Sequence, residues 1–186
     1  MGRMLQWESL NEQHAFMLLD CDPRVRRFSE QPCVVPFTMN GVRHLHYPDI
    51  LVETDCSSEL WEVKTEKGAR LPEIAQRTSL LALGLIRYGY TYRLVLDRDL
   101  NEAAPLKNAD TLLRFGWRPI SDSEREGMRT RFRQSGCLNW YEASRGTYGV
   151  RARQVLCRLV LEGYVEVNTT LLPSPAARFL PRAGYL

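Results

Sequence analysis

The stretch that decides the fold covers residues 46–64 and reads HYPDILVETDCSSELWEVK. Proline has no backbone N–H to donate to a neighbouring strand, so Pro48 interrupts or bends a strand immediately before Asp49. Residues 55–58 predict a turn, which would join two antiparallel strands. Asp49 and Glu62 would then lie close together on neighbouring strands.

Glu62 and Lys64 are expected on one face of the second strand, because strand side chains alternate between the two faces. An isolated Glu-x-Lys is more often an exposed charge pair on a sheet. Here a second carboxylate, Asp49, converges on the same point. Two carboxylates at one point repel unless a divalent cation neutralises them.

A third acid comes from the helix that residues 9–20 predict. Glu12 shares one stripe of this helix with Phe16 and Leu19. An acid on an apolar stripe tends to point inward, where it needs a partner. The alternative is a residue at the boundary of the core that reaches out to water.

Together these residues predict a metal site. Glu12, Asp49, Glu62 and the Val63 carbonyl supply the oxygen ligands that Mg²⁺ or Mn²⁺ prefers, and we expect two ions. Lys64 beside them would orient or deprotonate a water, or stabilise charge in the transition state. The expected reaction is metal-dependent hydrolysis of a phosphodiester.

The elements around this stretch predict an α/β fold with a mixed sheet flanked by helices. Asn40-Gly41 is the strongest hairpin signal, and Gly89 would end the long helix in a left-handed conformation. The expected order is a helix over 9–20, a short strand or turn over 25–28, a three-strand meander over 33–38, 44–52 and 60–64, a helix over 71–88 and a strand over 91–96.

After Asp97 the pattern becomes helical. A capping box at Ser121–Glu124 opens a basic helix, a second helix covers 150–162, and a strand over 164–167 would pair with Leu171-Leu172. This order of helix, glycine, strand, turn and strand is typical of the C-terminal part of a winged-helix domain. We therefore expect a nuclease domain over 1–100 and a small winged-helix-like α+β region over 101–186 that binds DNA or a partner.

Composition sets the class of protein. The chain has 186 residues, 44% hydrophobic and 25% charged, with a net charge of only +3, so a buried core is expected and wholesale disorder is not. Ten arginines lie between Arg114 and Arg158. They would contact phosphates or form a solvated helix face, and we take Arg151 and Arg153, at the start of the second helix, as the expected DNA contacts.

The remaining signals place the protein in the cytoplasm. The five cysteines form no CxxC pair, which argues against a zinc site and against a secreted disulfide framework. The N-terminus has no apolar signal-peptide core, and the longest apolar run, over 80–86, is too short to span a bilayer.

The order helix-Glu, Pro-Asp, Glu-x-Lys, helix resembles the PD-(D/E)xK nuclease superfamily, and more closely the TnsA endonuclease subunits of heteromeric transposases. The resemblance covers residues 8–64 and includes an element with no obvious chemistry, Glu30-Gln31-Pro32. More weakly, residues 150–175 resemble the family's C-terminal winged-helix-like region. The matching motifs are Ser9-Leu-Asn-Glu12, Phe16–Leu19, Asp22-Pro23, Val25, Phe28, Glu30-Gln31-Pro32, His46-Tyr-Pro-Asp49-Ile-Leu-Val52 and Trp61-Glu-Val-Lys64.

This resemblance implies a restriction-endonuclease-like fold and a role in transposition. TnsA-type proteins cut the 5′ ends of a transposon in double-stranded DNA, while a separate DDE transposase cuts and joins the 3′ ends. An AAA+ regulator contacts their C-terminal part. Glu12, Asp49 and Lys64 match the family's catalytic positions, and Glu62 matches a position that is Gln in some members and Glu in many.

Two other functions stay open at this point. The chain could be a free-standing or phage-borne nuclease of the same fold, acting in restriction, repair or DNA processing. It could also be a catalytically idle DNA- or protein-binding module. The complete set of Glu12, Asp49, Glu62 and Lys64 argues against the idle module.

Overall fold

The computed structural model describes residue 6 and residues 8–186, and the chain divides into two compact units. Unit 1 comprises the chain up to Leu19 together with Arg24–Glu102, and unit 2 comprises Asp20–Pro23 and Ala103–Leu186. The sequence predicted the boundary between the two domains at residues 100 and 101. No helix among the described residues is both long and apolar enough to cross a membrane.

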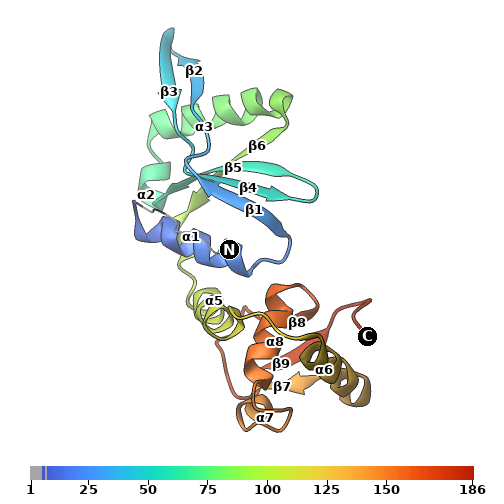
Figure 1. Cartoon of the computed structure of the whole chain (residues 1–186). Helices are drawn as coiled ribbons and strands as arrows, with labels where there is room; N and C mark the ends of the chain where they lie inside the picture. The colour runs from blue at the N-terminus through green and yellow to red at the C-terminus, as the bar shows by residue number, and fades with distance from the viewer. Residues whose placement is uncertain (1–5, 7) are drawn as a thin grey trace. The chain divides into compact units, whose positions relative to one another are not determined.

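Unit 1 is built on a mixed sheet of four strands in the order β1-β4-β5-β6 (Figure 1). β1 and β4 pair antiparallel, as do β4 and β5, whereas β5 and β6 are parallel. The parallel pair requires a crossover connection, which contains helix α3 (Pro72–Leu85). The strands are β1 (Val25–Glu30), β4 (Ile50–Thr54), β5 (Ser58–Lys64) and β6 (Tyr90–Leu96).

Helices cover both faces of this sheet (Figure 1). On one face Phe16 and Leu19 of α1 pack with Ile50 and Val63, and on the other Leu81 and Leu85 of α3 pack with Leu60 and Tyr92. Because side chains alternate along β5, Glu62 and Lys64 share the α3 face with Leu60. The helices are α1 (Leu10–Cys21), α2 (Glu66–Ala69), α3 (Pro72–Leu85), the 3₁₀ turn η1 (Ile86–Tyr88) and α4 (Asp97–Leu100).

The expected three-strand meander is wrong. The strand predicted over 44–52 is two strands, because Pro48 separates β3 (Val42–His46) from β4. β3 pairs with β2 (Val35–Met39) in a sheet of their own, which projects from the unit (Figure 1). The turn between them is confirmed: Asn40 and Gly41 have φ of 52° and 78°, which a two-residue hairpin turn requires.

The long helix predicted over 71–88 is confirmed with one refinement. It is α-helical to Leu85 and continues as the single turn η1 to Tyr88. Gly89 then takes a φ of 82° and ends it in the left-handed conformation, as expected.

Unit 2 packs helices against a three-stranded antiparallel sheet in the order β7-β9-β8. Its core centres on α8, whose buried side chains include Leu156 and Leu159. α5 approaches α8 closely at Gly116, where a Cβ would lie 2.9 Å from the Arg158 backbone nitrogen. The elements are α5 (Ala103–Gly116), α6 (Asp122–Ser135), β7 (Leu138–Asn139), α7 (Trp140–Ser144), α8 (Ala152–Leu161), β8 (Val165–Val167) and β9 (Arg178–Pro181).

The capping box is confirmed, since the Glu124 amide donates to the Ser121 hydroxyl and the Glu124 carboxylate accepts from the Ser121 amide. The expected pairing of strand 164–167 with Leu171-Leu172 is wrong. β8 pairs with β9, while the two leucines lie exposed in the loop between them. α5, α7 and β7 were not expected from the sequence.

Candidate active site

Asp49 lies immediately before β4, next to the strand β5 that carries Glu62. Ile50 pairs with Trp61 in this antiparallel ladder, and the Asp49 amide donates to the Trp61 carbonyl at 2.9 Å. Asp49 therefore lies just beyond the last paired position of the ladder, beside the segment of β5 that carries Glu62. The antiparallel pairing of the two strands, inferred from the turn at 55–58, is confirmed.

The Glu30-Gln31-Pro32 element acquires a structural role here. The Gln31 amide donates to the Asp49 carbonyl at 2.9 Å, which extends the β1–β4 pairing by one position. Gln31 has a φ of 37°, so β1 turns away at the residue that holds Asp49. The backbone of Asp49 is thus fixed from both neighbouring strands.

The Asp49 side chain is partly buried and points back at β5. Its Oδ2 accepts a hydrogen bond from the Val63 amide at 2.7 Å. Burial, with Glu62 adding repulsion, raises the pKa of Asp49 to about 6, although the Val63 amide and Lys64 act in the opposite direction. A carboxylate placed in this way gains from a nearby cation.

Glu62 is almost completely buried, with 2% of its surface exposed. Its Oε1 accepts from Arg77 Nη2 at 2.6 Å and lies 2.8 Å from Lys64 Nζ. Its Oε2 is buried and has no hydrogen-bond partner among the described residues. Two cations therefore hold one oxygen, while the other has an unused lone pair.

His46 and Tyr92 enclose that unused oxygen. His46 Nε2 lies 3.3 Å from Glu62 Oε2 and 2.9 Å from the Tyr92 hydroxyl. Burial lowers the pKa of His46, in spite of Glu62, so its neutral form is favoured. When Tyr92 donates its proton to Nε2, that nitrogen has none to offer Glu62.

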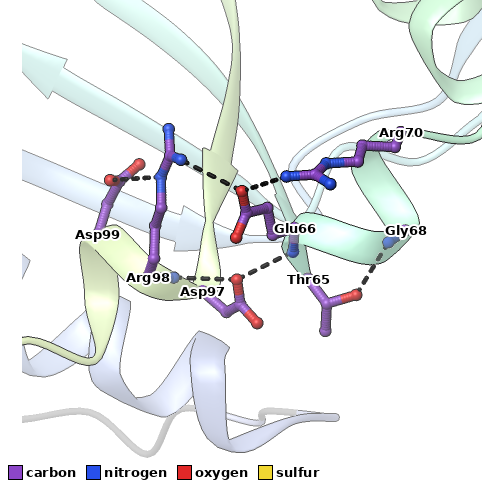
Figure 2. Close-up of polar contacts among 7 residues, drawn as sticks. All are labelled: Thr65, Glu66, Gly68, Arg70, Asp97, Arg98 and Asp99. Carbon is purple, nitrogen blue, oxygen red and sulfur yellow. Dashed lines mark hydrogen bonds and ion pairs between the residues drawn. The ribbon is translucent and has the colours of Figure 1, made fainter.

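Lys64 is the last residue of β5. The turns that follow β5 and β6 are joined by hydrogen bonds and ion pairs (Figure 2). Asp97 Oδ1 accepts from the amides of Glu66 and Arg98, both at 2.9 Å. Figure 2 also shows Arg70 and Arg98 bound to one oxygen of Glu66. The strand end that carries Lys64 therefore has little freedom to shift.

Glu12 is placed differently from the other three. Its Oε1 accepts from the Ser9 hydroxyl at 2.8 Å and its Oε2 from the Glu8 amide at 2.9 Å, so it caps the start of α1. It comes from the helix on the opposite face of the sheet and acts on Asp49 only through space, where it raises the pKa of that carboxyl slightly. The structure brings Asp49, Glu62 and Lys64 together and leaves Glu12 beside them.

The residues fit a hard divalent cation in part. Among the residues that the structure describes, no group of three or more His, Cys, Asp or Glu side chains is arranged to hold a metal. Mg²⁺, however, is often bound by one or two carboxylates and otherwise keeps its waters. Asp49 and Glu62 would supply two such carboxylates. The Val63 amide already binds Asp49, and its carbonyl stays an expected ligand.

Sequence reasoning missed Arg77, and there was a signal for it. Arg77 precedes the buried Leu81 and Leu85 by four and eight residues, so it occupies the inward stripe of α3. An arginine on such a stripe needs a buried acid, and Glu62 is that acid. His46 and Tyr92 carried no comparable signal, because β3 and β6 belong to different sheets and their side chains meet only in the tertiary fold.

The two expected DNA contacts lie in unit 2. The Arg151 guanidinium pairs with Glu124 at 3.0 Å and also donates to the Pro119 carbonyl. The Arg153 guanidinium lies 4.8 Å from the centre of the Phe115 ring. A role for either arginine in binding DNA stays a prediction.

The raised pKa of Asp49 predicts a pH-dependent stability. The unfolded carboxyl titrates near 3.8 and the folded one near 6, so the stabilising contribution is complete below pH 4 and is lost as the pH rises through 6. With metal chelated, Asp49→Asn should be as stable as the wild type near pH 4 and more stable above pH 6 by about 1–3 kcal/mol. Urea unfolding across this pH range measures the difference, and a difference independent of pH would contradict the assignment.

No protein-family model matches this chain, and no curated protein was found to match its sequence. The resemblance to TnsA-type nucleases therefore rests on the sequence motifs alone.

Proposed function

We propose that the chain is a Mg²⁺- or Mn²⁺-dependent DNA endonuclease that hydrolyses phosphodiester bonds. The observation that carries the proposal is the meeting of three side chains where β4 begins and β5 ends: Asp49, which accepts from the Val63 amide, Glu62, which has a buried oxygen without a hydrogen-bond partner, and Lys64, which pairs with Glu62. A buried, unsatisfied carboxylate oxygen costs stability, and functional sites are where proteins tolerate such costs.

Each residue has a separate task in this proposal. Asp49 and Glu62 would hold the cation, which when bound supplies a Lewis acid and lowers the pKa of its water. Arg77 holds Glu62 through Oε1, which leaves Oε2 without a hydrogen-bond partner. Lys64 has 34% of its side chain exposed, so its ammonium group can contact both Glu62 and a phosphate that approaches from solvent.

Glu12 would complete the acidic set only by leaving its cap. Both of its oxygens are engaged at the start of α1. A second ion, if bound as the sequence predicts, would require Glu12 to turn toward Asp49. We propose Glu12 as a second-ion ligand on that condition.

Within this activity we propose the TnsA-like role: cutting the 5′ ends of a transposon together with a DDE transposase subunit and an AAA+ regulator. What supports it is the motif order over residues 8–64, together with the position of Gln31 on the Asp49 backbone. Unit 2 would then be the winged-helix-like part that binds DNA or the partner.

Nicking of supercoiled plasmid tests the activity. We expect nicked product with Mg²⁺ or Mn²⁺ and none with EDTA or with Ca²⁺ alone, because Ca²⁺ binds such sites with looser geometry. Equal nicking in EDTA would overturn the metal dependence. A stimulation by a co-expressed DDE transposase would favour the transposition role over a free-standing nuclease.

A further inference from the structure

The arginines of unit 2 differ in how their charges are used. Five of them pair with glutamates at 2.7–3.2 Å: Arg125, Arg129, Arg133, Arg151 and Arg158. Arg114, Arg118 and Arg153 have no carboxylate within ion-pair distance in the part of the chain that the structure describes. Their charges are therefore available to an outside anion.

The same three arginines lie against aromatic rings. Arg153 and Arg114 are 4.8 and 5.8 Å from the centre of the Phe115 ring, and Arg118 is 4.8 Å from the centre of the Trp117 ring. Phe115 packs against the core of unit 2, but Trp117 is 65% exposed. Trp117 thus offers a large flat ring to solvent, next to uncompensated positive charge.

These residues are close in the chain or in contact, and we call them the basic–aromatic patch: Arg114, Phe115, Trp117, Arg118 and Arg153. Arg114 and Phe115 lie in the last turn of α5, Trp117 and Arg118 follow its end, and Arg153 lies in the first turn of α8. The Phe115–Arg153 contact joins the two elements, and so does the hydrogen bond from Arg151 to the Pro119 carbonyl. The patch is thus held together by tertiary contacts within unit 2.

The chemistry of the patch matches a nucleic-acid strand. Exposed arginine–aromatic contacts contribute little to stability, so they do not explain an exposed tryptophan among unpaired arginines. Guanidinium groups bind phosphates well, and an exposed ring stacks on a base whatever the sequence. A blunt duplex hides the faces of its bases, so the ring fits a strand with unpaired bases.

We propose that the basic–aromatic patch binds DNA beside unpaired bases, with Arg114, Arg118 and Arg153 on phosphates and Trp117 stacked on a base. This inference rests on the proposed function only in taking DNA as the ligand. It moves the expected contact surface away from Arg151, whose charge Glu124 already neutralises.

Binding of fluorescent DNA to the full chain tests the patch, with Asp49→Asn as the parent so that nothing is cut. The ligands are a single-stranded oligonucleotide, a blunt duplex and a duplex with a single-stranded overhang. Trp117→Ala should weaken binding to the first and third by about 5- to 150-fold, the range measured for loss of one stacked base, and leave the blunt duplex nearly unchanged. Replacing Arg114 and Arg118 by Gln should reduce the slope of log K against log salt on the single strand by about 1.4.

Arg133→Gln is the matched control, because Arg133 is about half exposed, at 52%, and already pairs with Glu126. Unchanged affinity of the Trp117 variant, or an equal loss with the control, overturns the patch. If the patch fails while the wild-type chain nicks plasmid, the proposed nuclease activity stands. If the patch binds as expected while the wild-type chain never nicks, the nuclease activity fails and the surface stands.

Discussion

Asp49→Asn is expected to reduce metal-dependent nicking by at least about 10³-fold, because the cation site loses one of its two carboxylates. A bound metal contributes several kcal/mol of transition-state stabilisation, and 10³-fold corresponds to about 4 kcal/mol. The amide can still accept from the Val63 amide, so the fold should persist. Initial nicking rates in Mn²⁺, with circular dichroism as a check on folding, measure the loss.

Glu53→Gln is the control for this variant. Glu53 lies on the same strand four residues away and pairs with Arg27 at the surface, far enough along β4 to leave the Asp49–Glu62 pair intact. It should nick like the wild type. If Asp49→Asn keeps more than a tenth of the wild-type rate, Asp49 is not a metal ligand for this reaction.

Lys64→Ala should lose turnover but keep metal binding. We expect single-turnover cleavage to fall by about 10²–10⁴-fold, the usual contribution of a group that moves a proton or stabilises developing charge. The metal should still bind, because Arg77 continues to hold Glu62 Oε1 when Lys64 is removed. Calorimetric titration with Mn²⁺ gives the affinity independently of cleavage.

The comparison is Lys67→Ala, an exposed lysine three residues further on that should have no effect on either measurement. Loss of metal binding in Lys64→Ala would show that Lys64 positions Glu62 and does not act on the phosphate. An unchanged cleavage rate would remove Lys64 from the active site.

The part of the fold that was predictable is the part whose contacts are local. Residues 55–58 lie between Asp49 and Glu62, and the turn itself sets their register. Asn40-Gly41, Gly89 and the Ser121 capping box likewise depend on a few adjacent residues. These features follow from backbone geometry, which the local sequence determines.

The features that were missed depend on distant pairing. The sequence shows that Pro48 disturbs a strand, but not that the residues before it leave the main sheet for a hairpin with β2. β8 found its partner in β9, beyond a loop that carries the more apolar Leu171-Leu172. In this case the strand pairs with a segment other than the apolar segment nearest to it in the sequence.

The residues of the candidate site also differ in how far local sequence predicts their positions. Asp49, Glu62 and Lys64 came from alternation and register, and they lie together. Glu12 came from a helical stripe and from motif resemblance, and the capping contacts that engage it are formed by Ser9 and Glu8, three and four residues before it. The sequence Ser9-Leu-Asn-Glu12 has the spacing of a capping box, a signal that competes with the catalytic interpretation.

Anomalous scattering from Mn²⁺ in crystals of the chain tests the central claim most directly, because it does not depend on a partner or on turnover. We predict a peak within about 2.0–2.2 Å of one oxygen from Asp49 and one from Glu62, with the Asp49→Asn crystals lacking it under the same conditions. Crystals soaked in Mn²⁺ at concentrations that support nicking, with no peak at Asp49 and Glu62, would contradict the account.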